Sequence, residues 1–207
     1  MQSKFSGMDL ARALDRIEEI HAQVAKGEVF RGYRPVPVAI AGAVGLLAGW
    51  LQPSLVPEGD APRFLGYWIA VALGNVAVNA AVIAAGYARC GDAFARRHTR
   101  RVVGQFVPCL LAGAAVTLGL PAAGPGLVRI LPGLWALLFG LGVFASRPYL
   151  ARATGWVALF FVAAGTGLLL FPPATYAALG LAHGAVFGAG LLGAAVVLRL
   201  DLPREER

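Results

Sequence analysis

From residue 36 onward, long apolar runs alternate with short polar or proline-containing segments. Each run is long enough to cross the roughly 30 Å hydrocarbon core of a bilayer as an α-helix, which takes about 17–25 residues. The pattern predicts an all-α fold, a polytopic transmembrane bundle of six helices. The expected spans are 36–52, 64–88, 102–120, 127–146, 154–171 and 177–198.

The N-terminal segment has a different periodicity. Apolar residues recur every three or four positions between residues 9 and 26, opposite a charged face, which predicts a cytoplasmic amphipathic helix. This helix either lies on the membrane surface or docks on a partner helix, and its candidate partner contacts are Leu10, Leu14, Ile17 and Val24. The expected organisation is therefore a lead-in over 1–35, a membrane domain over 36–200 and a cytoplasmic tail over 201–207.

Prolines and charged residues fill the expected connections. Pro53 and Pro121 follow the first and third runs, and we expect Arg96, Arg97 and His98 to lie in a polar loop after the second. Arg147 and Arg152 mark a true exit between the fourth and fifth spans, because two arginines at mid-bilayer would cost several kcal/mol.

The distribution of basic residues fixes an expected orientation. Of the 18 Lys and Arg residues, all but Arg63 and Arg129 fall on one side of a six-span arrangement. Basic loops face the cytoplasm, so both termini are expected inside, in a bacterial inner membrane. The same rule accounts for the net charge of +7, and no nucleic-acid partner is predicted.

Carboxylates are confined to the connections and termini. None of the 11 Asp and Glu residues lies in an expected span, which disfavours carboxylate-coupled transport and intramembrane aspartyl proteolysis. No catalytic, cofactor-binding or metal-binding residues are predicted.

A few polar residues do lie within the spans. The candidate polar cluster is Asn75, Asn79, Gln105 and His183, which either holds helices together or lines a cavity. A single membrane histidine does not suit a bis-histidine haem. We expect His183 to hydrogen-bond to Asn75, Asn79 or a backbone carbonyl instead.

Small residues and aromatic residues give two further expectations. Gly180, Gly184 and Gly188 in the last span, with Gly45 and Gly49 in the first, predict either close packing inside the bundle or a dimer face. Aromatic residues near span ends predict anchors at the membrane interface, namely Trp68, Trp135, Trp156 and Tyr176.

The layout resembles rhomboid intramembrane proteases, which have six helices with both termini inside. Ala182-His183 resembles their last-helix motif, and Asn79 could stand for the helix-2 Asn. Pro132 occupies the place of the nucleophilic serine, so the resemblance implies a catalytically dead relative. The chain also resembles a group of uncharacterised bacterial six-helix membrane proteins, through Arg16–His21, Leu131–Trp135 and Ser146–Leu150, which implies no activity.

Three functions remain open at this point. The favoured hypothesis is a non-enzymatic accessory, regulatory or interaction subunit, as a homodimer or within a larger membrane complex. The second is a small-solute transporter or channel. The third is a lipid-acting enzyme at the basic segment, where Arg96, Arg97, Arg100 and Arg101 are candidate contacts for anionic lipid.

Overall fold

The computed structural model describes residues 35–89, 93–147, 150 and 152–201. The predicted N-terminal helix, with Leu10, Leu14, Ile17 and Val24, lies outside these residues, as do all of the lead-in before Pro35 and most of the tail.

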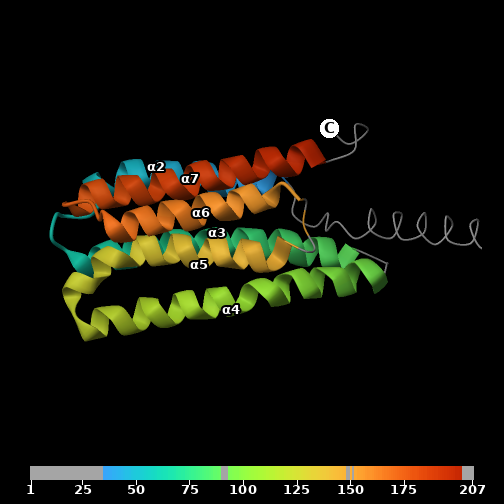
Figure 1. Ribbon diagram of the computed structural model, residues 1–207, viewed down its shortest axis with the longest axis horizontal. Helices are drawn as coiled ribbons and strands as arrows, with labels where there is room; N and C mark the ends of the chain where they lie inside the picture. The colour runs from blue at the N-terminus through green and yellow to red at the C-terminus, as the bar shows by residue number, and fades with distance from the viewer. Residues whose placement is uncertain (1–34, 90–92, 148–149, 151, 202–207) are drawn as a thin grey trace, which may run out of the picture.

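The described chain is an all-helical bundle, as the sequence predicts (Figure 1). Five segments of it are long and apolar enough to cross a membrane, while α6 is a shorter apolar helix. The elements in chain order are α2 (Pro35–Leu55), α3 (Ala61–Arg89), α4 (Ala93–Ala123), the 3₁₀-helix η1 (Pro125–Ile130), α5 (Leu131–Ser146), α6 (Thr154–Leu170) and α7 (Tyr176–Asp201).

Several helix ends differ from the predicted ones. Pro53 and Pro121 lie within the last turns of α2 and α4 rather than in loops. The backbone of Arg96 and Arg97 is helical, because α4 begins at Ala93 and no glycine or proline interrupts it before Gly104. Residues 127–130 form part of η1, so the fourth long helix begins at Leu131.

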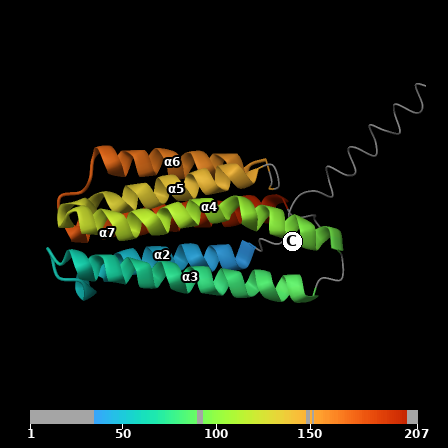
Figure 2. The same cartoon turned by 90° about the horizontal axis from the view of Figure 1, so that it is seen from below.

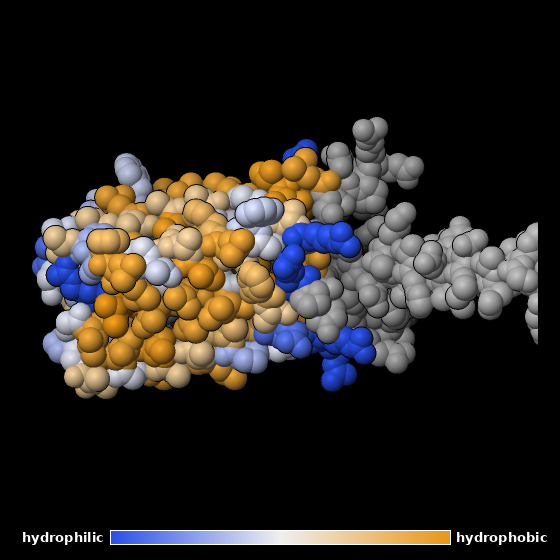
Figure 3. All heavy atoms as spheres, viewed as in Figure 1, coloured by the Kyte–Doolittle hydropathy of each residue, from blue (hydrophilic) through white to orange (hydrophobic). Residues whose placement is uncertain are grey.

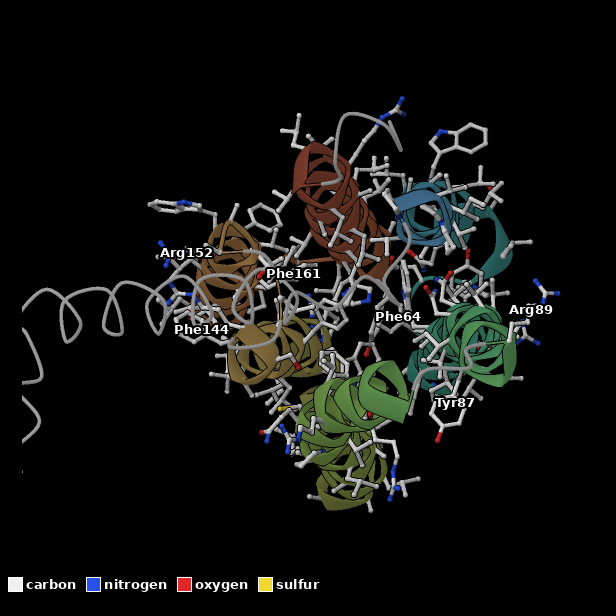
Figure 4. The ribbon with its side chains drawn as sticks, turned by 90° about the vertical axis from the view of Figure 1, so that its right-hand side faces the viewer. Phe64, Tyr87, Arg89, Phe144, Arg152 and Phe161 are labelled. Atoms are coloured by element: carbon white, nitrogen blue, oxygen red, sulfur yellow. The ribbon has the colours of Figure 1, made fainter. Side chains whose placement is uncertain are left out.

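The helices α2 to α7 surround a common centre when the bundle is viewed along its axis, with Phe64 turned toward that centre and Arg89 and Arg152 at the rim (Figure 4). Figure 2 shows α2 beside α3 on one side and α4, α5 and α6 on the other. The connections α2–α3, α4–η1 and α6–α7 gather at the end away from the C-terminus (Figure 1). We call this the outer end of the bundle and the opposite one the inner end.

Two glycine seams hold the helices together. Between the antiparallel α2 and α7, a Cβ at Gly49 would lie 2.9 Å from the Cα of Gly184, and one at Gly42 would lie 3.0 Å from the carbonyl oxygen of Gly188. The predicted glycine stripes therefore pack against each other inside the bundle. Such close approach gains dispersion contacts along both backbones.

The second seam joins α5 to α6 and is not among the glycine pairings expected from the sequence. A Cβ at Gly133 would lie 2.9 Å from the carbonyl oxygen of Gly165, and one at Gly140 would lie 3.0 Å from that of Ala158. Phe161 of α6 packs into the adjoining core with Ala136 and Phe139 of α5 and Phe187 of α7. This packing fixes α6 beside its neighbours despite its shorter length.

The surface carries a broad apolar band between two polar ends (Figure 3). Leu73 of α3 and Leu111 of α4 are 63% and 65% exposed within the chain. Beyond Trp68, no described residue of α3 is fully buried. The helices α3 and α4 are thus the least covered part of the bundle.

Candidate functional site

His183 lies at the centre of an aromatic cluster near the outer end of the bundle. It is 5% exposed, and its ring centroid lies 4.4 Å from that of Trp68, 5.4 Å from that of Trp135 and 4.7 Å from that of Phe187. These rings come from α3, α5 and α7, so the imidazole joins three helices. Trp68 is therefore buried inside the bundle and Trp135 is half-buried against its core, rather than serving as membrane-interface anchors.

The backbone of Pro132 is the hydrogen-bond partner of His183. One of the partners expected from the sequence, a backbone group, is thus the observed one, while neither asparagine reaches the ring. The Nδ1 atom of His183 has no partner among the described residues. A neutral imidazole that donates through Nε2 presents Nδ1 as a bare acceptor.

Two other buried polar side chains near His183 lack partners. The indole N–H of Trp68, which is 3% exposed, and both side-chain polar atoms of Gln52, which is 0% exposed, make no hydrogen bond in the described part of the chain. An unsatisfied buried polar group costs about 1–3 kcal/mol, so such a set needs an explanation.

Gln52 of α2 packs against α7 about one turn before this histidine. Its side chain is packed against the backbone of Gly180, where any Cβ would overlap the amide. Gly180 and His183 are three residues apart and thus neighbours on one face of α7. One turn earlier on α2, the carbonyl of Ala48 accepts a 2.7 Å hydrogen bond from the hydroxyl of Tyr67, which precedes Trp68. We call Gln52, Trp68 and His183 the buried polar triad.

In the same region, the indole N–H of Trp135 does have a hydrogen-bond partner. Its Nε1 donates a 2.8 Å hydrogen bond to the hydroxyl of Thr117 on α4. That hydroxyl in turn donates to the carbonyl of Gly113 at 2.6 Å. Trp135 therefore links α4 to the aromatic cluster with no polar atom of its side chain unpaired.

The predicted polar cluster is not assembled as one site. Asn75 and Asn79 lie further along α3 toward the inner end than Trp68, and the Nδ2 of Asn79 donates to the carbonyl of Asn75 at 2.9 Å. Gln105 is exposed on α4. No hydrogen bond in the described part of the chain joins either asparagine or Gln105 to His183.

The burial of one face of α3 decreases along the helix, from the outer end toward the inner end. Phe64 and Trp68 are buried, whereas Val71, Asn75 and Asn79 on the same face are half-buried. The Asn75 side-chain amide makes no hydrogen bond within the described residues. We call Asn75 and Asn79 the asparagine step. At these two residues, other helices of this chain cover only part of the α3 face that is turned toward the bundle.

At the outer end, charged side chains are engaged with backbone groups. The carboxylate of Glu58 accepts hydrogen bonds from the N–H groups of Tyr176 (2.6 Å) and Ala177 (3.1 Å) at the start of α7. The guanidinium of Arg129 donates to the carbonyl oxygens of Pro173 and Ala174 and lies 5.7 Å from the Tyr176 ring centroid. These contacts hold the α6–α7 connection in place.

The basic inner end is only partly described. Arg100 and Arg101 of α4 are exposed, and the side chains of Arg96 and Arg97 lie outside the described residues. Arg147 lies 5.7 Å from the Phe144 ring centroid. Among the described residues, no group of three or more His, Cys, Asp and Glu residues is arranged to hold a metal ion.

Of the residues in the buried polar triad, sequence reasoning singled out only His183. The sequence predicts Gln52 at the end of the first span and Trp68 as an interface anchor. The available signal was the position of Gln52 four residues after Ala48 on α2 and four before Val56, just beyond the helix, since a polar residue that continues an apolar helix face is turned toward a neighbouring helix. The chain matches no protein-family model, no curated protein and no solved structure.

Proposed function

We propose that this protein is a six-span membrane protein with both termini in the cytoplasm, and that it works as a non-enzymatic accessory subunit. In this proposal the asparagine step receives a transmembrane helix from another subunit. The supporting observation is the face of α3 that is buried at Phe64 and Trp68 but only half-covered at Asn75 and Asn79.

A count of six spans rather than five requires that α6 crosses the membrane. Its 17 residues extend about 26 Å as an α-helix, slightly less than a typical hydrocarbon thickness. It lies alongside α5 over most of that helix (Figures 1 and 2). Arg152 precedes it and Pro172 follows it, as expected for a span whose ends reach the two interfaces.

The chemistry of Asn75 supports a helix as the occupant of the asparagine step. A primary amide carries two donor hydrogens and an acceptor oxygen, and leaving these unpaired in hydrocarbon costs several kcal/mol. A neighbouring helix with a polar side chain at the same depth would pair with the amide, and one such bond is worth about 0.6–2 kcal/mol. Lipid tails offer no such partner.

The particle mass of the detergent-extracted protein tests this proposal. We expect the wild-type chain to migrate with additional polypeptide mass, and Asn75→Leu combined with Asn79→Leu to reduce the particle to a single chain. Gln105→Leu is the matched control, because Gln105 is an exposed span amide on α4 and should leave the mass unchanged. A wild-type particle of single-chain mass, or a double variant that keeps its extra mass, contradicts the proposal.

The runner-up function is small-solute transport, which would use Asn75 and Asn79 to line an aqueous path. It predicts that a cysteine at position 79 reacts with a water-soluble, membrane-impermeant maleimide. The subunit proposal predicts protection at that position, because a packed helix excludes water.

One further observation favours the rhomboid-like alternative. Two residues that carry the resemblance are in contact, since the backbone of Pro132, in the serine's place, pairs with His183 of the last-helix motif. On α3, however, the residue beside His183 is Trp68 rather than Asn79. A catalytically dead rhomboid-like protein is compatible with the subunit proposal, since both exclude chemistry at Pro132.

A further inference from the structure

The buried polar triad presents donors and acceptors in nearly equal number. Gln52 and Trp68 offer the amide and indole N–H donors, while Gln52 and His183 offer the amide oxygen and the Nδ1 lone pair. All three side chains are at least nine-tenths buried. Buried polar groups without hydrogen-bond partners destabilise a folded chain, whose stability is only marginal, so these groups need a partner.

No described protein group satisfies these atoms. The indole of Trp68 and the imidazole of His183 meet edge to face at 87°, a packing contact that pairs neither Trp68 Nε1 nor His183 Nδ1. Gln52 is fixed by the backbone of Gly180, one turn from His183. Of the charged groups at the outer end, Glu58 and Arg129 are occupied with the backbone, and Arg63 pairs with Asp60.

We propose that Gln52, Trp68 and His183 form an intramembrane binding site for a small uncharged molecule that both donates and accepts hydrogen bonds, either water or a solute with hydroxyl or amide groups. The mixture of donors and acceptors disfavours a bare cation or anion, because either ion would face groups of the wrong polarity. The guest is small, since the site is bounded by the backbone of Gly180 and the rings of Trp68 and His183.

The site is independent of the proposed partner helix. It lies where α2, α3 and α7 meet near the outer end, whereas the asparagine step lies further toward the inner end. A buried guest with about three hydrogen bonds to these helices would stabilise their junction, as internal water does in soluble proteins. A solute would do the same only when present, which makes the protein's stability depend on solute concentration.

The indole N–H of Trp68 provides a direct probe. The chain has 4 tryptophans, so ¹⁵N-tryptophan labelling gives a simple NMR spectrum of the indole N–H groups in detergent. Trp68→Phe assigns the resonance, and the Trp135 N–H, which is bonded to Thr117, reports whether a variant is folded.

The wild-type protein gives the first result. A cross-peak between the Trp68 indole proton and water identifies water as the guest. A saturable shift of that proton on titration with glycerol or urea, with loss of any water cross-peak, identifies a solute. If the Trp68 proton shows neither a water cross-peak nor a saturable shift, the proposal is overturned.

The Gln52→Leu variant gives the second result. In the proposal the guest bridges Gln52 and Trp68, while these two side chains make no hydrogen bond to each other. We expect the water cross-peak to disappear, or the solute affinity to fall at least tenfold, while Gln105→Leu leaves both unchanged. A cross-peak or affinity that persists in Gln52→Leu overturns the shared site. If Gln52→Leu shifts the Trp135 resonance, the fold is perturbed and Gln52→Asn is measured instead. This substitution retracts the amide by one methylene, and we expect the same loss of the water cross-peak or of solute affinity.

Discussion

The carboxylate of Glu58, in the α2–α3 connection, accepts a 2.6 Å hydrogen bond from the backbone N–H of Tyr176, at the first residue of α7. The N-terminus of a helix carries unpaired N–H groups and a partial positive charge, so a carboxylate there is doubly favourable. The contact joins the α2–α3 connection to the start of α7, 118 residues further along the chain, and so closes the outer end of the bundle.

We expect Glu58→Ala to destabilise the bundle by about 0.5–2 kcal/mol, the usual value of a helix-capping side chain. Glu58→Gln should lose less, because its amide oxygen still accepts one hydrogen bond. The midpoint of thermal unfolding in detergent, followed by circular dichroism, measures both. An unchanged midpoint in Glu58→Ala would show that the contact contributes nothing to stability.

The α2–α7 seam depends on the absence of a side chain at Gly184. A Cβ there would lie 2.6 Å from the Cα of Gly49, and both atoms belong to rigid helix backbones. We expect Gly184→Ala to force the helices apart and cost about 1–3 kcal/mol. The matched control is Gly193→Ala on the same helix, where an added Cβ meets nothing within 4 Å.

The same unfolding assay separates these two variants. Gly193→Ala should equal or slightly exceed the wild-type midpoint, because alanine has the higher helix propensity. Equal midpoints for Gly184→Ala and Gly193→Ala would refute the backbone-to-backbone seam.

The hydrogen bond from Trp135 to Thr117 links α5 to α4 within the membrane region. We expect Thr117→Val and Trp135→Phe each to destabilise the bundle, with a coupling of about 0.6–2 kcal/mol in a double-mutant cycle. Additive effects of the two substitutions would mean that the bond does not contribute.

The proposed orientation predicts which connections are reachable from outside the cell. In a chain whose two cysteines are replaced by serine, Ala174→Cys in the α6–α7 connection should react with an impermeant maleimide in intact cells. Ala153→Cys in the α5–α6 connection should react only after the membrane is opened. If Ala153→Cys reacted in intact cells and Ala174→Cys did not, the termini would lie outside. Equal labelling of the two cysteines would contradict an odd number of spans between positions 153 and 174.

The helices and the first glycine seam could be predicted because each leaves a one-dimensional pattern. Apolar runs of span length define the helices, and glycines spaced by three or four residues define faces that fit together. The α5–α6 seam has the weaker spacing of Gly133 and Gly140, seven residues apart with Ala136 between them, and this pattern is common in glycine-rich membrane helices.

The candidate site was predicted less well because hydropathy gives the depth of a residue but not its partners. Asn75 and His183 both lie within spans, yet the α3 residue that meets His183 is Trp68, about two turns from Asn75. Likewise, the end of a span is normally wet, so Gln52 gave no reason to expect complete burial. Its position is set by the packing of α2 on α7, which no local pattern encodes.

The most direct test of the proposed function is photocrosslinking from position 79 in native membranes. A photoreactive amino acid at Asn79 should form a crosslink to a polypeptide, either a second copy or another subunit. The same probe at Leu73, which is 63% exposed on a different face of α3, should react with lipid instead. Protein crosslinks at 79 and not at 73 are the predicted result; lipid adducts alone at both positions would contradict the account.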